Sequence, residues 1–587
     1  MQTIHYYKVA AYQVSRSILA IRWRDQTAEL LYPLAIGLQS RELQPIFLTG
    51  VLKMMAMLVA LGLIALTALL VLVVGGAIVA CSARGRMLMG LELLSYSIGF
   101  GILGLAILGV GVVSVSLDYQ TNAWVLLSIG LLLSCVQWYR TNIFSRMFGS
   151  KAGTLATDAR IAILGWLLMA SIPMLITFLP VKMPSDLPDG AYVIKNDHLH
   201  VRVQVMMGAM PADNFIPFAA TEYLLRDISF AEERPLMPGQ ELANRPILMS
   251  LAAVPLRAAM GPPQKVVGPL PTFRYVGKQW PDVGSFGDDR SYRRFLAVAL
   301  VLNASLFVGA ALLFQYFRLR RGYWVAGLLV FGSSPYFIGQ TLFAWPKSLA
   351  AFFLLLSAFT LLARDRTWVA GLLAALAYWS HPYAVVFIGA FALYLLIRER
   401  NDQNPRRGLL PFAIVATGGP VVWWAWAYWY LQLPSDLVEQ NLSVSAGLAS
   451  HAATRFINLL NAIAPISFHS LPSVVDLVQA SLLGIVGAVG LLLLPQAAFA
   501  SVQCIRQHSK EFVLLLALPS ALLIGVFSVL TIPAVHGLHA VSVALLMLSL
   551  RWMQQRNLTS LMLACVTGQL VINIALLLHR GHALLFG

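Results

Sequence analysis

Roughly fourteen apolar runs, each about long enough to cross a bilayer, constrain the fold of this chain most strongly. A helix rises 1.5 Å per residue, so the ~30 Å hydrocarbon core of a membrane needs about 20 apolar residues. Of the 587 residues, 59% are hydrophobic and only 11% are charged, whereas soluble domains carry about 25% charged residues. The sequence therefore predicts an all-α polytopic membrane protein with about 13–14 transmembrane helices.

The apolar runs also predict which parts of the chain belong together. A polar stretch, 181–293, contains no run of membrane length and separates two groups of apolar runs. The predicted organisation is an N-terminal amphipathic or interfacial segment at 1–53, N-terminal transmembrane helices at 54–160, a transmembrane core at 161–180 and 294–579, and one large loop at 181–293. The approximate runs are 54–81, 90–116, 121–139, 161–180, 294–316, 321–338, 344–363, 367–380, 382–397, 409–430, 476–497, 511–531, 533–549 and 557–579.

Basic residues predict the orientation of these spans. Arginines and lysines concentrate in alternate connections, such as 140–160, 318–321 and 398–407, while the short connections at 338–343 and 380–383 hold none. Connections rich in Lys and Arg stay on the cytoplasmic side. The sequence therefore predicts that the 181–293 loop lies on the outer face of a cytoplasmic (inner) membrane. The net charge of +16 is then explained by the orientation of the spans and does not indicate nucleic-acid binding.

The large loop carries its own secondary-structure signals, which predict a mixed α/β segment. Apolar residues alternate over 199–205 and predict a strand, with a hairpin partner at 192–194. Residues 215–226 have the pattern of an amphipathic helix in which Glu222 and Arg226 form an i,i+4 pair. The Pro- and Gly-rich stretch 235–280 is expected to be irregular.

Asp213 is the first candidate for chemistry, because it stands in the loop just before the predicted helix. Transfer onto a hydroxyl or amine needs a carboxylate that takes the acceptor's proton. The alternative for Asp213 is a plain helix N-cap, a position that Asp fills routinely.

Three basic residues form the second group of candidates. Arg245 stands beside a proline at the start of an apolar run, and Lys347 and His381 stand at the ends of apolar segments on the same predicted membrane face as the loop. Ionisable groups at membrane depth are costly and therefore indicate a functional site, and an arginine in such a place can bind a phosphate group. The structural alternatives are snorkelling to the interface for Arg245 and Lys347 and a capped helix break for His381.

Other chemistry has little support in the sequence. The four cysteines form no CxxC or zinc spacing, and no HExxH or phosphate-binding glycine loop is present. No metal site is assigned. Paired acidic residues in the loop are nevertheless a possible binding site for a divalent cation. The aromatic residues at 423–430 are typical of a membrane-interface belt.

The order of these features resembles the GT-C superfamily of integral-membrane glycosyltransferases. The resemblance covers roughly 160–550: a span with a basic flank, a long outer loop with an acid and a helix at 213–226, an Arg-Pro apolar run at 244–255, and short spans that follow. It implies a polyprenyl-phosphate-linked sugar donor and a glycan, lipid or protein acceptor. It also implies that the catalytic carboxylate is Asp213 or, as a second choice, Glu222. In the same way it implies that Arg245, Lys347 and His381 bind the donor phosphate.

Two other functions fit the same composition. One is a transporter or flippase for lipid-linked or polysaccharide substrates, which should show inverted repeats and charges at the membrane midplane. The other is a non-catalytic scaffold of an envelope-polysaccharide assembly. The sequence has no matched halves, and its candidate ionisable residues gather at the ends of apolar runs, which favours the glycosyltransferase.

Overall fold

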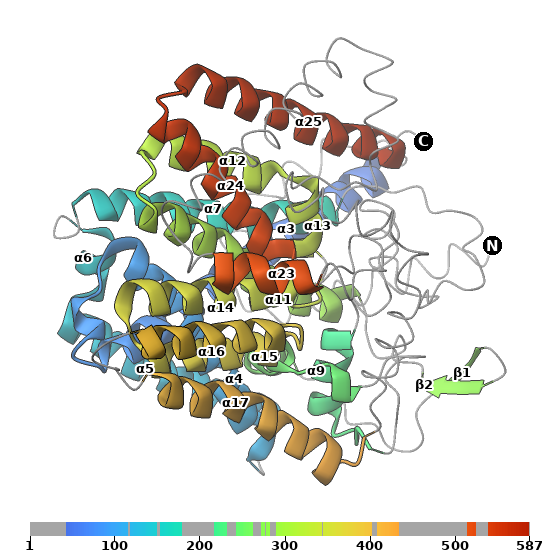
Figure 1. The fold of residues 1–587 in the computed structure, drawn as a ribbon. Helices are drawn as coiled ribbons and strands as arrows, with labels where there is room; N and C mark the ends of the chain where they lie inside the picture. Colours follow the sequence, from blue (N-terminus) through green and yellow to red (C-terminus); the bar gives the residue numbers. More distant parts are fainter. Residues whose placement is uncertain are drawn as a thin grey trace, which may run out of the picture. The chain divides into compact units, whose positions relative to one another are not determined.

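In the computed structural model, the described part of the chain folds mainly into α-helices (Figure 1). The chain divides into two units, residues 1–59 and 60–587, and the packing below is that of the second. The structure describes residues 43–115, 118–149, 153–178, 216–231, 242–261, 272–275, 278–281, 289–342, 344–401, 408–433, 513–523 and 538–585.

Most described residues lie in α-helices, with short 3-10 and π turns between them. The α-helices are α3 (Leu43–Ala80), α4 (Gly90–Ser114), α5 (Tyr119–Thr141), α6 (Ile143–Phe148), α7 (Thr154–Ile176), α9 (Ile216–Arg226), α10 (Leu248–Ala259), α11 (Asp289–Tyr316), α12 (Arg321–Ser333), α13 (Pro335–Leu342), α14 (Lys347–Phe359), α15 (Thr367–Ser380), α16 (Ala384–Asn401), α17 (Leu409–Trp424), α23 (Leu518–Leu522), α24 (Leu538–Gln555) and α25 (Thr559–Leu585). The 3-10 turns are Gly85–Met87 and Leu242–Asn244, and the π turns are Thr360–Arg364, Ala425–Tyr430 and Val513–Ala517.

The described part of the chain contains seven helices that are long and apolar enough to cross a membrane, and α12 with α13, bent by 59° at their junction, makes up to eight. The prediction of a multi-pass helical membrane protein is therefore confirmed. The predicted runs 54–81, 90–116, 121–139, 161–180, 294–316, 344–363 and 409–430 each correspond to one of the seven. The total of 13–14 spans stays a prediction, because the run at 476–497 and most of 511–531 lie outside the described residues.

The helices differ sharply in how much of their surface other helices cover. The most apolar 18-residue window is 100% buried in α11 and 83% buried in the span that begins with α14, but only 22% buried in α5 and in α17. Helices that are apolar on all sides and fully covered form the centre of a bundle. We therefore describe α11 and α14 as the central helices, with α5 and α17 presenting apolar side chains to lipid.

Glycines bring several of these helices into backbone contact. A Cβ atom on Gly101 of α4 would lie 1.9 Å from the Val71 carbonyl oxygen of α3, and one on Gly109 would lie 2.0 Å from the Leu251 oxygen of α10. Small residues permit such close packing between helices in membranes. Helix α4 also packs on α7 and α11, so the helices predicted as an N-terminal group share one apolar core with the rest of the second unit.

The loop segments contain more regular structure than the sequence analysis expected. The predicted helix at 215–226 is confirmed as α9, and its Glu222–Arg226 ion pair is present at 3.1 Å. The stretch 235–280, expected to be irregular, instead contains α10 and the antiparallel strands β1 (Thr272–Tyr275) and β2 (Lys278–Pro281), paired with Thr272 opposite Pro281. Two residues join these strands, which is the shortest common hairpin connection. The predicted strands at 192–194 and 199–205 lie outside the described residues.

Candidate functional site: a cationic cavity around Trp345

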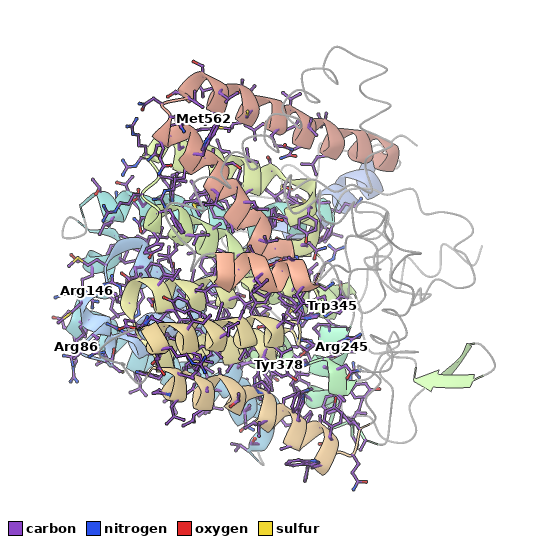
Figure 2. All side chains as sticks on the ribbon, viewed as in Figure 1. Arg86, Arg146, Arg245, Trp345, Tyr378 and Met562 are labelled. Atoms are coloured by element: carbon purple, nitrogen blue, oxygen red, sulfur yellow. The ribbon has the colours of Figure 1, made fainter. Side chains whose placement is uncertain are left out.

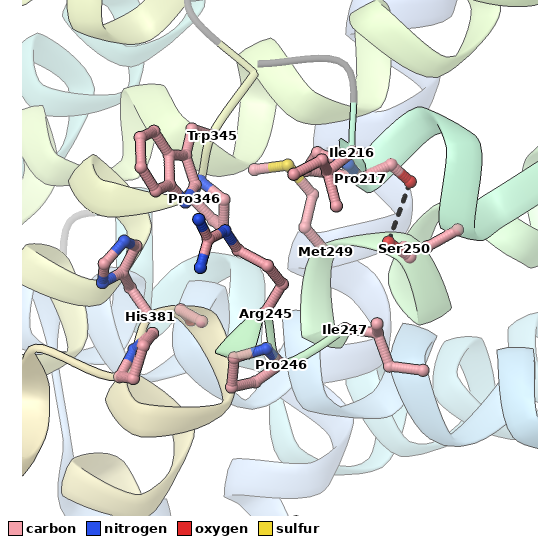
Figure 3. A pocket seen from close by; sticks show the side chains of 13 residues that line it. Ile216, Pro217, Arg245, Pro246, Ile247, Met249, Ser250, Trp345, Pro346 and His381 are labelled. Atoms are coloured by element: carbon pink, nitrogen blue, oxygen red, sulfur yellow. Dashed lines mark hydrogen bonds between the residues drawn. The ribbon is translucent and has the colours of Figure 1, made fainter. Parts of the chain in front are cut away.

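A narrow cavity lies where four parts of the chain meet (Figure 3). It is built by the first turn of α9, the segment that leads into α10, the segment before α14, and the break between α15 and α16. The lining residues are Ile216, Pro217, Ala220, Arg245, Pro246, Ile247, Met249, Ser250, Trp345, Pro346, Ser380, His381 and Pro382.

The cavity has two chemically different sides (Figure 3). Arg245, Trp345 and His381 face one another on one side, and apolar side chains including Ile216 and Met249 line the other. Such a surface is complementary to a molecule that joins an anionic group to an apolar chain.

The Trp345 ring is the centre of the cationic side. The Arg245 guanidinium carbon lies 5.3 Å from the centre of the ring, and the Lys347 ammonium nitrogen lies 4.0 Å from it. The His381 ring packs against the same indole with 5.2 Å between centres. The negative face of an indole attracts cations, by about 0.5–1 kcal/mol when exposed and 2 or more when desolvated. The ring therefore holds three basic side chains close together, although the charges of Arg245 and Lys347 repel.

Lys347 contacts the ring but is not one of the residues that line the cavity. Its side chain is fully buried, at 0% exposure, whereas Arg245 is half-buried. The Tyr383 hydroxyl donates a hydrogen bond to the Lys347 carbonyl oxygen at 3.0 Å, which ties the start of α14 to the α15–α16 break. The predicted donor contact of Lys347 thus has to be indirect in this conformation, because its ammonium group contacts the Trp345 ring and does not line the cavity.

Local hydrogen bonding defines the proton on His381. Its Nδ1 accepts the backbone N–H of Tyr383 at 3.3 Å. A nitrogen that accepts carries no hydrogen, so the network assigns the hydrogen of the neutral ring to Nε2. His381 therefore offers a donor to its surroundings from Nε2, which is the polarity that an anion requires.

Three helices begin at this cavity. Ile216 and Pro217 open α9, Met249 and Ser250 stand in the first turn of α10, and Pro346 is the N-cap residue of α14. A helix N-terminus carries a partial positive charge and backbone N–H groups that point outward. The helix ends therefore add to the positive potential of the basic side chains.

Aromatic residues of α17 and of the π turn that follows it position Arg245. The Trp423 indole N–H donates to the Ala243 carbonyl oxygen at 2.8 Å, and the Tyr428 hydroxyl donates to Asn244 Oδ1 at 3.4 Å. Both partners stand in the 3-10 turn directly before Arg245. The 423–430 cluster thus has two roles: Trp423 is buried and holds this turn, while Trp429 and Tyr430 are 78% exposed, as an interface belt requires.

Two hydroxyl groups fix the starts of α9 and α10 against each other. Ser250 donates to the Pro217 carbonyl oxygen at 2.8 Å, drawn as the dashed line in Figure 3. Thr221 donates to the same oxygen at 2.8 Å within α9, and its hydroxyl also lies 3.4 Å from the Ser250 carbonyl oxygen of α10. Pro217 and Ser250 both line the cavity, so the contacts between the two helices set the width of its apolar side.

Glu222 has the geometry of a structural residue. It is fully buried, and its two carboxylate oxygens accept from Arg257 Nε at 2.9 Å and from Arg226 Nε at 3.1 Å. Arg257 in turn donates to the Gly261 carbonyl oxygen at 2.6 Å and to the Ser291 hydroxyl at 3.0 Å. A carboxylate enclosed in this way has no open side for an acceptor, so the surroundings of Glu222 are those of a structural residue and not of a catalytic base.

The remaining sequence candidates divide clearly. Asp213, the first choice for the carboxylate, lies outside the described residues. Arg245 and His381 line one cavity, and Lys347 contacts its central ring without lining the cavity. Sequence reasoning missed Trp345 and Ser250, although a tryptophan directly before Pro346 and Lys347 was a local signal for the first. Among the described residues no group of three His, Cys, Asp or Glu side chains could hold a metal ion.

Figure 2 places the cavity residues Arg245 and Trp345 at one end of the helices and Arg86 and Arg146 at the other. No family model matches the sequence, and no curated protein or solved structure is significantly similar to it.

Proposed function

We propose that the protein is a membrane glycosyltransferase that takes a sugar from a polyprenyl-phosphate-linked donor and transfers it to a glycan, lipid or protein acceptor. The observation that carries this proposal is the two-sided cavity, with Arg245, Trp345 and His381 on one side and an apolar wall on the other. The donor has the same two parts, a phosphate group and an isoprenoid chain. A donor held in the membrane by its chain also needs no nucleotide site.

In this proposal the phosphate lies beside the Arg245 guanidinium and the His381 Nε2–H, and the first isoprene units contact Ile216 and Met249. The acceptor hydroxyl attacks the anomeric carbon of the sugar, and the bond from that carbon to the phosphate oxygen breaks. The electron pair leaves with the phosphate, whose growing negative charge the basic side chains stabilise. The acceptor's proton passes to a carboxylate.

Asp213 is the proposed proton acceptor. It stands three residues before Ile216, whose side chain lines the cavity, and three residues span at most about 11 Å. A general base contributes about 10²–10⁴-fold to a rate. We therefore propose that Asp213→Asn reduces transfer by that factor while folding is preserved, because Asn caps helices as well as Asp does.

The test incubates purified full-length protein with a panel of polyprenyl-phosphate sugars and follows sugar transfer, sugar release and prenyl phosphate production. The matched control is Asp227→Asn, another loop acid, which is exposed and adopts a left-handed conformation with φ of 61° that Asn tolerates. Equal activity of Asp213→Asn and parent at matched protein levels contradicts the assignment of the base.

The same donor panel, given to the protein reconstituted in vesicles, separates the other two functions. Movement of the intact lipid-linked sugar across the vesicle membrane without cleavage would indicate a flippase. Binding without movement or cleavage would indicate a scaffold.

The orientation of the membrane helices belongs to the same proposal. We place the cavity on the outer face of the cytoplasmic membrane, because the basic connections lie at the other end of the spans. A cysteine introduced at the exposed Asp227 should then react with an impermeant thiol reagent added from outside. Protection of that cysteine, together with labelling of one at Arg320, would reverse the orientation.

A further inference from the structure

A second cavity lies at the opposite end of the central helix α11. It has an empty volume of about 590 Å³, is open on one side, and is lined by Thr154, Asp158, Gln315, Leu319, Arg321 and Trp324. At its N-terminal end, α11 contacts Arg257 of α10 through Ser291. From Ser291 to Gln315 the helix rises by about 36 Å at 1.5 Å per residue, which is close to the thickness of a membrane.

The charged groups of this second cavity form an ordered set. Asp158 Oδ1 pairs with Arg321 Nη2 at 3.2 Å, and Asp158 Oδ2 accepts from Gln315 Nε2 at 2.9 Å. The Arg321 side chain is 50% exposed and that of Asp158 is 20% exposed. Both charges are therefore held in place by the protein and remain accessible from the open side. Because one is positive and one negative, the lining has no net charge.

Two helices begin at the second cavity. Thr154 is the first residue of α7 and Arg321 is the first residue of α12. Their N-terminal N–H groups favour a phosphate on the side of Arg321. The carboxylate of Asp158 favours a primary ammonium group, which donates hydrogen bonds to it.

The helices that flank the cavity expose apolar side chains further along their length. Leu164 and Leu168 on α7 are 58% and 48% exposed, and Leu329 on α12 is 54% exposed. These positions lie within the predicted hydrocarbon region, next to a cavity at its edge. A ligand with a charged head and acyl chains would therefore place the head in the cavity and its chains along α7 and α12.

We propose that this cavity binds the headgroup of a zwitterionic phospholipid that carries a primary amine, of the phosphoethanolamine type. The phosphate contacts Arg321 and the starts of α7 and α12, and the ammonium contacts Asp158. This site is independent of the proposed transfer reaction, since it lies at the other end of α11 and shares no residue with the Trp345 cavity.

The test measures lipid retention. Purified full-length protein is equilibrated with vesicles of equal parts phosphatidylethanolamine, phosphatidylglycerol and phosphatidylcholine, isolated again, and its bound lipids are quantified by mass spectrometry. Phosphatidylethanolamine should be enriched over both others. Each contact to a partly exposed charge is worth up to about 1 kcal/mol, so the enrichment should fall about fivefold in Asp158→Asn and in Arg321→Gln. Arg321→Lys should keep most of it.

The matched control is Glu92→Gln, which breaks the Glu92–Arg364 ion pair, lines neither cavity and should leave the enrichment unchanged. Thermal melting of each variant shows that the fold is retained. Equal retention of the three lipids, preference for phosphatidylglycerol, or enrichment unchanged in both cavity variants would overturn the proposal. Displacement of the lipid by soluble phosphoethanolamine at equal headgroup concentration would also overturn it, in favour of a soluble ligand.

Discussion

Arg245 and Arg257 stand twelve residues apart at the two ends of one buried segment, and their surroundings differ in every respect. Arg257 is 3% exposed and is enclosed by Glu222, Gly261 and Ser291. Arg245 is half-buried, lies over the Trp345 ring and lines a cavity. One guanidinium is committed to holding helices together, and the other faces a space that can receive a ligand.

The comparison shows why residue type alone does not identify a binding arginine. Arg245 stands three residues before α10 and Arg257 lies in the last turn of the same helix, and both carry the charge that a phosphate would select. Partner geometry separates them, because a buried charge needs compensation from nearby groups. Arg257 receives that compensation from a carboxylate, a carbonyl and a hydroxyl, so its substitution should affect the fold and that of Arg245 the ligand.

The largest effect is expected when the Arg257 pair is broken. Arg257→Ala leaves the Glu222 carboxylate buried beside only Arg226, and the loss of one partner of a buried pair costs about 3–5 kcal/mol. The free energy of unfolding in detergent should fall by this amount. Arg226→Ala serves as the control: that side chain is 14% exposed, so solvent can partly replace its contact with Glu222 and a smaller loss is expected than for Arg257→Ala. Equal losses in the two variants would remove the distinction between the enclosed and the peripheral arginine.

Arg245→Ala should leave unfolding nearly unchanged and should weaken binding instead. A charge-assisted contact contributes about 1.5–3 kcal/mol, so the Kd for a prenyl phosphate should rise about ten- to a hundredfold. Equilibrium binding of a fluorescent prenyl phosphate measures this change. Arg293→Ala is the matched control, because Arg293 also lies over an aromatic ring, Phe178 at 4.1 Å, but does not line the cavity. A parent-like Kd in Arg245→Ala would place the ligand elsewhere.

Lys347→Met should have a smaller effect than Arg245→Ala on the same binding measurement. Methionine approximates the apolar stem, so the packing against Trp345 is kept and only the charge is lost. A charge that acts through space without lining the cavity should change the Kd by roughly three- to tenfold. If Lys347→Met weakens binding more than Arg245→Ala, the lysine reaches the ligand directly and the ring must move to let it do so.

The smallest effect is expected for Trp345→Phe. A phenyl ring keeps an aromatic face for the basic side chains but attracts cations less strongly than an indole, and a whole cation–π contact at an exposed site contributes about 0.5–1 kcal/mol. The Kd should therefore rise by no more than about two- to fivefold, and Trp345→Leu, which removes the aromatic face, should raise it further. Identical values for Phe and Leu would show that Trp345 fills space without organising the three basic side chains.

Several elements of the fold and the site could be predicted from the sequence. The apolar runs correspond to helices wherever the structure describes them, because the length and composition of a span are local properties. Helix α9 and its Glu222–Arg226 pair were predictable for the same reason, since i,i+4 neighbours meet on any helix. Arg245, Lys347 and His381 could be chosen as candidates because charge next to an apolar run is visible without a structure.

Only the tertiary structure decided how those candidates are arranged. Glu222 meets Arg257 across 35 residues, and Arg245, Trp345 and His381 come together from three separate segments. No periodicity in the chain encodes such contacts, because they depend on the angle and depth at which α9, α10, α14 and α15 pack. The sequence by itself determined that basic groups stand at the ends of membrane helices. Packing decided that one of them is enclosed, one packs on an indole outside the cavity and two line the cavity, because a buried charge is stabilised only by the neighbours that folding brings to it.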